Sequence, residues 1–208
     1  MARDTEAKCR RCRSYGDKLF LKGTKCTTDK CPAVKRAFRP GQHGKKRRKE
    51  SNYGMQLREK QKAKRIYGIL ERQFKKYFML AEHSKGVTGH ALLEFLERRL
   101  DNVIFRLSFT YSRAQARQMV KHNKVYVNGK KVNIPSYLVK SGDTVEVKGK
   151  EQNLKRLSEI RKELKDRVIP KWLGVDKDAP KAEVKALPKK EDLDFSIQEQ
   201  LIVELYSK

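Results

Sequence analysis

Four cysteines, Cys9, Cys12, Cys26 and Cys31, are the residues best suited to chemistry in this chain, and no other cysteine follows them. Two residues separate the members of the first pair, four separate those of the second, and thirteen lie between the pairs. Two close thiol pairs can each clamp one side of a metal ion while the loop between them folds back to complete a tetrahedron. The spacing of this cysteine segment, residues 9–31, predicts one structural zinc ion that leaves no open position for a substrate.

Other uses of the thiols remain open. Two disulfides would suit an oxidising compartment, and an iron–sulfur cluster also takes four thiolates. His43 is a conceivable substitute ligand, although a lone histidine in a basic loop is more often a surface residue. The opening residues, MARDTEAKCRR, have no apolar signal core, and no hydrophobic run approaches the roughly 18 residues of a membrane span. We therefore expect a cytoplasmic protein with reduced thiols and no membrane contact.

The charge of the chain predicts a polyanionic partner. Lys and Arg number 51 against 25 Asp and Glu, a formal net charge of +26. Residues 1–150 hold 38 basic and 13 acidic side chains, whereas residues 151–208 hold 13 and 12. A charge that only kept the protein soluble would be spread more evenly, so a localised contact with nucleic acid is favoured.

Three basic segments are candidates for that contact. The loop RPGQHGKKRRKE contains an unbroken basic run from Lys45 to Lys49, and its glycines are too close together for a nucleotide-binding loop. A helix predicted over residues 52–66 carries cations on its surface: Arg58, Lys60, Lys62, Lys64 and Arg65. Further along, Arg113, Arg117 and Lys121 follow at steps of four and should form one ridge beside a basic hairpin that contains Lys124 and Lys130.

The elements that would position these residues can be predicted from periodicity and capping. We expect helices over residues 71–83, from Thr88 to about residue 110, from Ser112 with Gln115 as its capping box, and over 154–164. Asn128-Gly129 predicts a hairpin, Asn123 a left-handed helix end, and YLV and TVEV further strands. We expect a short strand at KLFLKG, irregular structure over residues 170–194, and a terminal strand in EQLIVELYSK.

The predicted fold class is α+β: an N-terminal zinc knuckle, a helical first domain and an inserted α/β RNA-binding module of two helices on a small, mainly antiparallel sheet. The knuckle and basic loop occupy residues 1–50, the helical domain residues 51–97 plus 195–208, and the module residues 98–194. The first domain is expected to be discontinuous because the last segment has no obvious partner nearby.

Two stretches resemble a known family. LREKQKAKRIYG and RLDNVIFRLSFTYSRAQARQMVKHNKVYVNGKKVNIPSY, together with RPGQHGKKR and the cysteine spacing, are similar to the fourth protein of the bacterial small ribosomal subunit, in its zinc-binding form. The similarity runs along the whole chain. Leu70 stands where a capping Ser is usual in that family, and Asn123 where Gly is usual.

The resemblance implies a ribosome-bound, non-enzymatic protein that binds small-subunit ribosomal RNA early, nucleates assembly of the subunit body and contributes to translational accuracy. It implies contact with ribosomal protein five of the small subunit and with messenger RNA at the entry channel. It implies that the four cysteines are the zinc ligands. Together with the charge pattern, it gives these RNA-binding candidates: Gln42, His43, Gly44, Lys45, Lys46, Arg47, Arg48, Lys49, Arg58, Lys60, Lys62, Arg65, Arg113, Arg117, Lys121, His122, Lys124 and Lys130.

Two other functions compete with this one. An RNA-modifying enzyme could carry the same module as an accessory, but it would need a separate catalytic domain, for which too few residues are left. A zinc-dependent DNA-binding regulator would place a recognition helix in the major groove, and the helix that contains Arg113 could serve.

Overall fold

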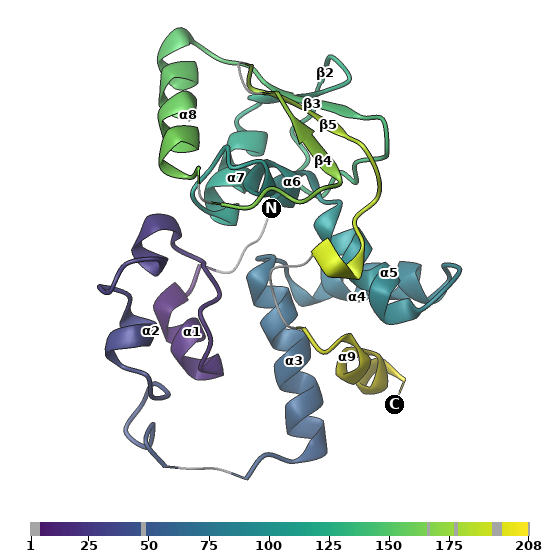
Figure 1. The fold of residues 1–208 in the computed structure, drawn as a ribbon. Helices are drawn as coiled ribbons and strands as arrows, with labels where there is room; N and C mark the ends of the chain where they lie inside the picture. Colours follow the sequence, from purple (N-terminus) through teal and green to yellow (C-terminus); the bar gives the residue numbers. More distant parts are fainter. Residues whose placement is uncertain (1–4, 47–48, 166, 177–178, 193–196, 208) are drawn as a thin grey trace. The chain divides into compact units, whose positions relative to one another are not determined.

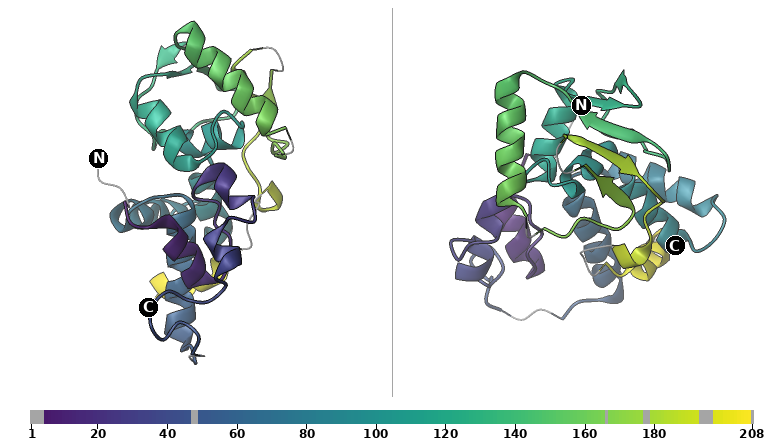
Figure 2. Two further views of the ribbon diagram at one scale, coloured as in Figure 1. Left: turned by 90° about the vertical axis from the view of Figure 1, so that its left-hand side faces the viewer. Right: turned by 45° about the horizontal axis from the view of Figure 1, so that its top comes forward.

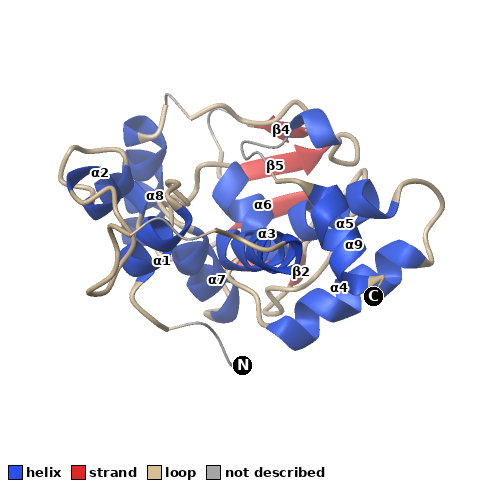
Figure 3. Ribbon diagram, turned by 90° about the horizontal axis from the view of Figure 1, so that it is seen from below, coloured by secondary structure: helices blue, strands red, loops and turns tan. Residues whose placement is uncertain are grey.

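The computed structural model describes residues 5–46, 49–165, 167–176, 179–192 and 197–207. Its contacts divide the chain into two compact units, Met1–Leu92 with Phe195–Lys208, and Leu93–Asp194. The first unit thus combines both ends of the chain, and its boundary falls at Leu92 rather than at residue 97. In the described residues, every strand belongs to the second unit (Figure 3).

The regular secondary structure in the described part of the first unit is all helical. The cysteine segment forms α1 (Lys8–Tyr15), the 3-10 helix η1 (Gly23–Cys26) and α2 (Pro32–Lys35). The strand predicted at KLFLKG is wrong, because Phe20 and Gly23 have φ angles of 50° and 72° and the chain turns there. Left-handed backbone cannot continue an extended strand.

The two long helices of this unit were predicted correctly. α3 spans Asn52–Ile66, and the hydroxyl of Ser51 caps it by accepting a hydrogen bond from the Gly54 N–H at 3.2 Å. α4 spans Glu71–Glu82, and its apolar stripe of Phe74, Tyr77, Phe78 and Ala81 is buried. Leu70 offers no side-chain cap at the start of α4.

The C-terminal segment is a helix, α9 (Glu199–Tyr206), so the predicted terminal strand is wrong. α9 packs beside α3 (Figures 1 and 2). Ile202 is fully buried, and the Tyr206 ring stacks on Phe78 with 4.4 Å between centroids. Ile202 and Tyr206 are four residues apart and therefore lie on one face of the helix. This spacing explains the packing of the segment, whereas the alternation of its apolar residues had predicted a strand.

Glu71 connects α3, α4 and α9. Its carboxylate accepts hydrogen bonds from Lys60 Nζ at 2.7 Å, Lys64 Nζ at 2.9 Å and the Tyr206 hydroxyl at 2.8 Å. Partial burial raises the pKa of Glu71, but the hydrogen bonds from Lys60, Lys64 and Tyr206 outweigh it and lower the pKa to about 2. Burial and the same carboxylate raise the pKa of Tyr206.

Glu71→Gln should therefore destabilise the first unit, and mostly above pH 4.5. A carboxylate with a depressed pKa stabilises the folded state above its unfolded pKa, and this contribution is lost as the pH falls from about 4.5 to about 2. Because the Glu71 side chain is 45% exposed, we expect a loss of only about 1 kcal/mol at pH 7. Urea unfolding at pH 7 and pH 3 measures it; equal losses at both pH values would contradict the assignment.

The second unit packs helices against one sheet. α6 (Leu100–Arg106) and α7 (Arg113–Lys121) lie side by side (Figure 1). The sheet contains β1 (Val125–Val127), β2 (Lys130–Lys131), β3 (Thr144–Val147), β4 (Leu173–Val175) and β5 (Lys181–Val184) in the order β2-β1-β3-β5-β4, with every pair antiparallel. The core joins Val103, Phe109 and Val120 of the helical part to Val125 and Val145 of the sheet. This arrangement is α+β, as predicted.

Local signals in this unit were predicted well. The Ser112 hydroxyl caps α7 by accepting from the Gln115 N–H at 3.3 Å, and Asn123 has a φ of 58°. Asn128 and Gly129, with φ angles of 50° and 75°, form the turn between β1 and β2. α8 spans Glu151–Glu163, close to the predicted 154–164.

Two predictions for this unit are wrong. The described part of residues 170–194 is not irregular throughout: β5 pairs with β3 and with β4, burying Trp172, Leu173 and Val184, and the 3-10 helix η2 (Lys190–Asp192) follows. Residues 177–178 and 193–194 of this prediction lie outside the described residues. YLV makes only one isolated bridge, between Leu138 and Arg99.

No helix in the described residues is long and apolar enough to span a membrane.

The long helix predicted from Thr88 is interrupted. α5 (Thr88–Glu97) ends before Arg99, whose backbone is extended, and α6 begins at Leu100. The Leu100 N–H donates to the Tyr137 carbonyl at 2.8 Å, and the Val139 N–H donates to the Arg98 carbonyl at 3.0 Å. These hydrogen bonds attach the break between α5 and α6 to residues 137–139. They outweigh the apolar periodicity, which had predicted one continuous helix.

A cluster of buried polar side chains surrounds the break. Arg106 donates to both carboxylate oxygens of Glu97 at 2.9 and 2.8 Å, and Arg99 donates to both of Asp101 at 3.0 and 2.7 Å. The Asn102 amide donates to Glu97 at 2.7 Å. Glu97, Arg99 and Arg106 are at most 2% exposed. Buried charges of this kind are tolerated because each finds a bidentate partner.

Candidate nucleic-acid interface and cysteine segment

The four thiols of the cysteine segment come from α1, from η1 and from the residue that precedes α2. All four cysteines are free, and Cys12, Cys26 and Cys31 are buried. Burial raises the pKa of the Cys12 thiol, the Leu19 N–H lowers it, and the three other thiols raise it further. Burial likewise raises the pKa of Cys26, whose sulfur accepts a hydrogen bond from the Lys22 N–H at 3.3 Å.

Two observations bear on a metal ion here. No group of three or more His, Cys, Asp or Glu side chains is arranged as a metal site within the described ranges. The donor chemistry nevertheless fits, because four free thiols are the ligand set of a closed structural zinc site, and the Lys22 N–H is directed at the Cys26 sulfur.

The basic loop after this segment is exposed where the structure describes it. Gln42, His43, Lys45, Lys46 and Lys49 are exposed, whereas the predicted residues Arg47 and Arg48 lie outside the described residues. Gly44 is needed for the loop's shape, because a Cβ at this position would overlap the backbone carbonyl of Arg39. The loop therefore presents its cations from a compact turn.

A hollow of about 540 Å³ lies between this loop and α1. It is lined by Arg13, Gly16, Ala37, Phe38, Arg39, Gly44, Lys45, Lys46 and Arg58, with no acidic side chain among these described residues. Arg13 and Lys45 lie over the Phe38 ring, 5.0 and 5.7 Å from its centroid. Five cations that line one hollow, two of them over an aromatic ring, are suited to phosphate groups and to an adjacent base or sugar.

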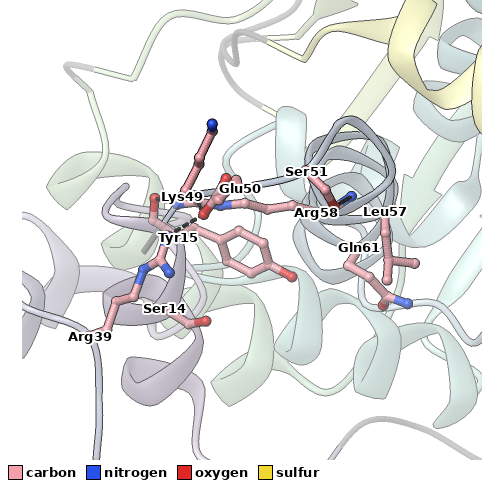
Figure 4. Close-up of a pocket in the computed structure, with 10 residues that line it drawn as sticks. Ser14, Tyr15, Arg39, Lys49, Glu50, Ser51, Leu57, Arg58 and Gln61 are labelled. Atoms are coloured by element: carbon pink, nitrogen blue, oxygen red, sulfur yellow. Dashed lines mark hydrogen bonds and ion pairs between the residues drawn. The ribbon is translucent and has the colours of Figure 1, made fainter. Parts of the chain in front are cut away.

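A second hollow, of about 550 Å³, lies beside it and is shown in Figure 4. Its residues come from α1, from the loop and from the start of α3. Glu50 forms ion pairs with Arg39 and with Arg58, whose Nη1 lies 2.6 Å from the carboxylate. The hydrogen bonds from Arg39 and Arg58, the first having the larger effect, lower the pKa of Glu50. Arg58 Nη2 also donates to the Tyr15 carbonyl at 2.7 Å. Glu50 thus holds two guanidinium groups at the rim of both hollows.

Several cations predicted on the surface of α3 are turned inward. Lys60 is 8% exposed and pairs with Glu71, and Lys62 pairs with Asp17 at 2.8 Å with its side chain 13% exposed. The prediction that both lie on the helix surface is wrong, because α3 is covered by neighbouring elements on several faces. Arg65 is half-buried.

The ridge on α7 is also divided. Arg113 is 8% exposed; its Nε donates to Asn102 Oδ1 at 2.8 Å, and its guanidinium lies 4.2 Å from the centroid of the Phe105 ring. Arg117 pairs with Asp101 at 3.3 Å and is 13% exposed. A single exposed ridge is therefore wrong for Arg113, which is a buried part of the polar cluster. Lys121, His122 and Lys130 are exposed, and Lys124 is half-buried.

Sequence reasoning missed Arg13 and Arg39. Both line the first hollow, yet neither belongs to the basic run or to a helical repeat of cations. Arg13 directly follows Cys12, so whatever fixes the backbone at Cys12 also fixes the position of the Arg13 side chain. That adjacency is the one signal that could have found it.

Comparisons with known proteins agree with these features. The model of the ribosomal protein S4/S9 N-terminal domain matches residues 3–97, and that of the S4 domain matches residues 98–145. The small ribosomal subunit protein uS4A of Symbiobacterium thermophilum is 56% identical over 208 residues, and the uS4 proteins of Desulfovibrio desulfuricans and Thermoanaerobacter pseudethanolicus are 57% and 56% identical over 208 and 209 residues. Each match covers the whole of both chains. The chain therefore belongs to the family of small ribosomal subunit protein uS4.

Proposed function

We propose that the protein is a structural constituent of the small ribosomal subunit that binds the subunit's ribosomal RNA. The observation that carries this proposal, beyond the family, is the hollow of Arg13, Arg39, Lys45, Lys46 and Arg58, which no described acidic side chain lines. The family is one of ribosomal structural proteins rather than enzymes. We therefore expect the protein to be bound to the ribosome in the cytoplasm.

Folded RNA suits these surfaces better than a base sequence does. Lysine and arginine side chains that contact phosphates fix the position of a protein on RNA without reading bases. A compact loop and a rigid pair of guanidinium groups, held by Glu50, match a fixed arrangement of phosphates. A junction of helices offers such an arrangement, because its backbones converge at set distances.

Finer roles follow from the family resemblance. We propose that the protein binds early, nucleates assembly of the subunit body and influences translational accuracy. Contacts with ribosomal protein five of the small subunit and with messenger RNA at the entry channel belong to the same proposal. Its support is the similarity along the whole chain.

One structural zinc ion, held by Cys9, Cys12, Cys26 and Cys31, is also part of the proposal. Its support is the paired spacing of four cysteines in the sequence, all of them free and three of them buried. When bound, zinc would cross-link α1, η1 and the start of α2, and it would supply folding energy but no chemistry. The cross-link would hold Arg13, next to Cys12, at the rim of the first hollow.

The affinity for RNA should fall steeply and log-linearly with salt, and Lys45→Ala with Lys46→Ala should flatten that slope by about 1–2. The matched control is Lys75→Ala with Lys76→Ala, an exposed lysine pair on α4 in the same unit. Both variants lose two charges, so only a pair that contacts phosphate should change the slope. Filter binding to small-subunit ribosomal RNA from about 0.05 to 0.3 M salt measures it. Equal slopes for the two variants would remove the basic loop from the interface.

A further inference from the structure

The second unit contains a cavity whose lining includes His122 and Lys124, two of the predicted RNA-binding residues, but whose apolar part no prediction explains. Its volume is about 260 Å³, and it lies between α7, the end of β3 and α8. The lining residues are Phe109, Gln115, Gln118, Met119, His122, Lys124, Val147, Lys148, Asn153, Leu154, Arg156, Leu157 and Ile160. All of them belong to one compact unit.

The inner wall of the cavity is apolar and firmly supported. Phe109, Leu157 and Ile160 are at most 5% exposed, and Met119 packs against the same core. Leu154, one turn before Leu157 on α8, is half-buried. Met119 from α7 and Leu154 from α8 thus offer two apolar walls to a flat apolar group.

The rim is polar, and its charged lining residues are basic. His122, Lys124, Lys148 and Arg156 line it, and the described lining residues include no Asp or Glu. Lys124 Nζ donates to Asn153 Oδ1 at 3.2 Å, which places one amide and one ammonium group together at the rim. Gln115 and Gln118 add two more side-chain amides. Lys148 also pairs with Glu146, which is not among the lining residues, at 3.2 Å. An apolar or a cationic occupant would give Lys124 and Arg156 no anionic partner at the rim.

We propose that this cavity binds one unstacked nucleotide from a single-stranded part of the small-subunit ribosomal RNA. The base enters between Met119 and Leu154, the amides meet its polar edge, and the flanking phosphates lie on Lys124, Lys148 and Arg156. Proteins hold flipped-out bases in pockets between aromatic or apolar side chains and form hydrogen bonds to the base edges. The volume is slightly below the roughly 300 Å³ at which pockets for drug-sized ligands begin, so it suits one base and not a stacked pair. This inference rests on the proposed function.

The unmodified protein allows a direct test with mononucleotides. Each of the four nucleoside 5′-monophosphates is titrated into the full chain, and backbone amide NMR shifts are followed at Gln118, Met119 and Leu154. Ribose 5-phosphate is the control, because it carries the same charge without a base. At least one nucleotide should bind about fivefold or more tightly than ribose 5-phosphate. Equal binding of all five compounds would overturn the inference and leave a site for anions only.

Cross-linking tests the same site on RNA. Leu154→p-benzoylphenylalanine places a photoreactive group at the cavity, and Ile134→p-benzoylphenylalanine places one at a side chain that is 53% exposed elsewhere in the unit. After irradiation in reconstituted subunits, primer extension should find one unpaired nucleotide linked to position 154 and not to position 134. RNA binding without that cross-link, or a cross-link from position 154 to another protein, overturns the inference but not the proposed function. A chain that binds no ribosomal RNA overturns both.

Discussion

Arg106→Met should destabilise the second unit by about 3–5 kcal/mol, because it leaves the Glu97 carboxylate buried without its bidentate partner. Glu97 is 1% exposed, so water cannot replace the guanidinium. The Asn102 amide, which donates to Glu97 at 2.7 Å, is neutral and cannot replace the lost positive charge. Removing one member of a buried ion pair is among the most costly single changes in a protein.

Trp172 reports this loss, since it is the chain's one tryptophan and is 3% exposed in the second unit. Its fluorescence during urea unfolding should show a much lower midpoint for Arg106→Met. Arg156→Met, an exposed arginine of the same unit, is the control and should shift the midpoint little. The double variant Glu97→Leu, Arg106→Met removes both charges and should recover much of the stability. A double variant no more stable than the single one would show that the cost arises from lost packing.

The second large effect concerns the metal. Purified under reducing conditions, the protein should contain one zinc ion per chain, and Cys12→Ser should abolish stoichiometric zinc. Structural zinc in small peptides contributes on the order of 10 kcal/mol to folding, far more than this short segment can obtain from its few buried side chains. Trypsin should then cleave the segment, which is rich in lysine and arginine, while the Trp172 transition stays unchanged because the second unit makes no use of the thiols.

His43→Ala is the matched control for the metal. His43 is exposed in the basic loop, so its loss should leave zinc in place and the segment resistant to trypsin. Elemental analysis and trypsin digestion of the three proteins distinguish the cases. Wild-type protein without any metal, or with iron and a visible absorption band, would contradict the zinc assignment.

The parts of the fold that the sequence predicted are those set by local interactions. The Ser51 and Ser112 caps, the left-handed Asn123 and the Asn128-Gly129 turn each depend on neighbouring residues only. The bounds of α3 follow from such signals. The buried stripe of α4 follows from a helical repeat that its neighbours did not alter.

The parts that were missed depend on contacts between distant segments. α9 is helical because Ile202 and Tyr206 pack on elements more than a hundred residues earlier in the chain. β5 pairs with β3 although α8 lies between them in the sequence, and although the KAEV sequence of β5 lies among Pro, Lys and Asp residues. No window of local sequence contains these partners.

The candidate interface was predicted in its segments but not in each side chain. The basic loop is exposed where it is described, whereas Lys60 and Arg113 are buried against carboxylate, amide and aromatic groups. A sequence gives the position of a cation on a helix, but not whether an acidic partner from another segment covers it. Direct contact of Lys60 and Arg113 with RNA stays a prediction. Arg113 packs against Asn102 and Phe105 and so stabilises the position of α7.

The most direct test of the proposed function is a footprint of the purified full chain on full-length small-subunit ribosomal RNA, with duplex DNA as competitor. Backbone cleavage by hydroxyl radicals reports which phosphates the protein covers. We predict one set of protections confined to a folded junction, which persists in a large excess of duplex DNA and weakens in Lys45→Ala with Lys46→Ala. Protections scattered over the RNA, or their complete loss to duplex DNA, would contradict a specific role in the subunit.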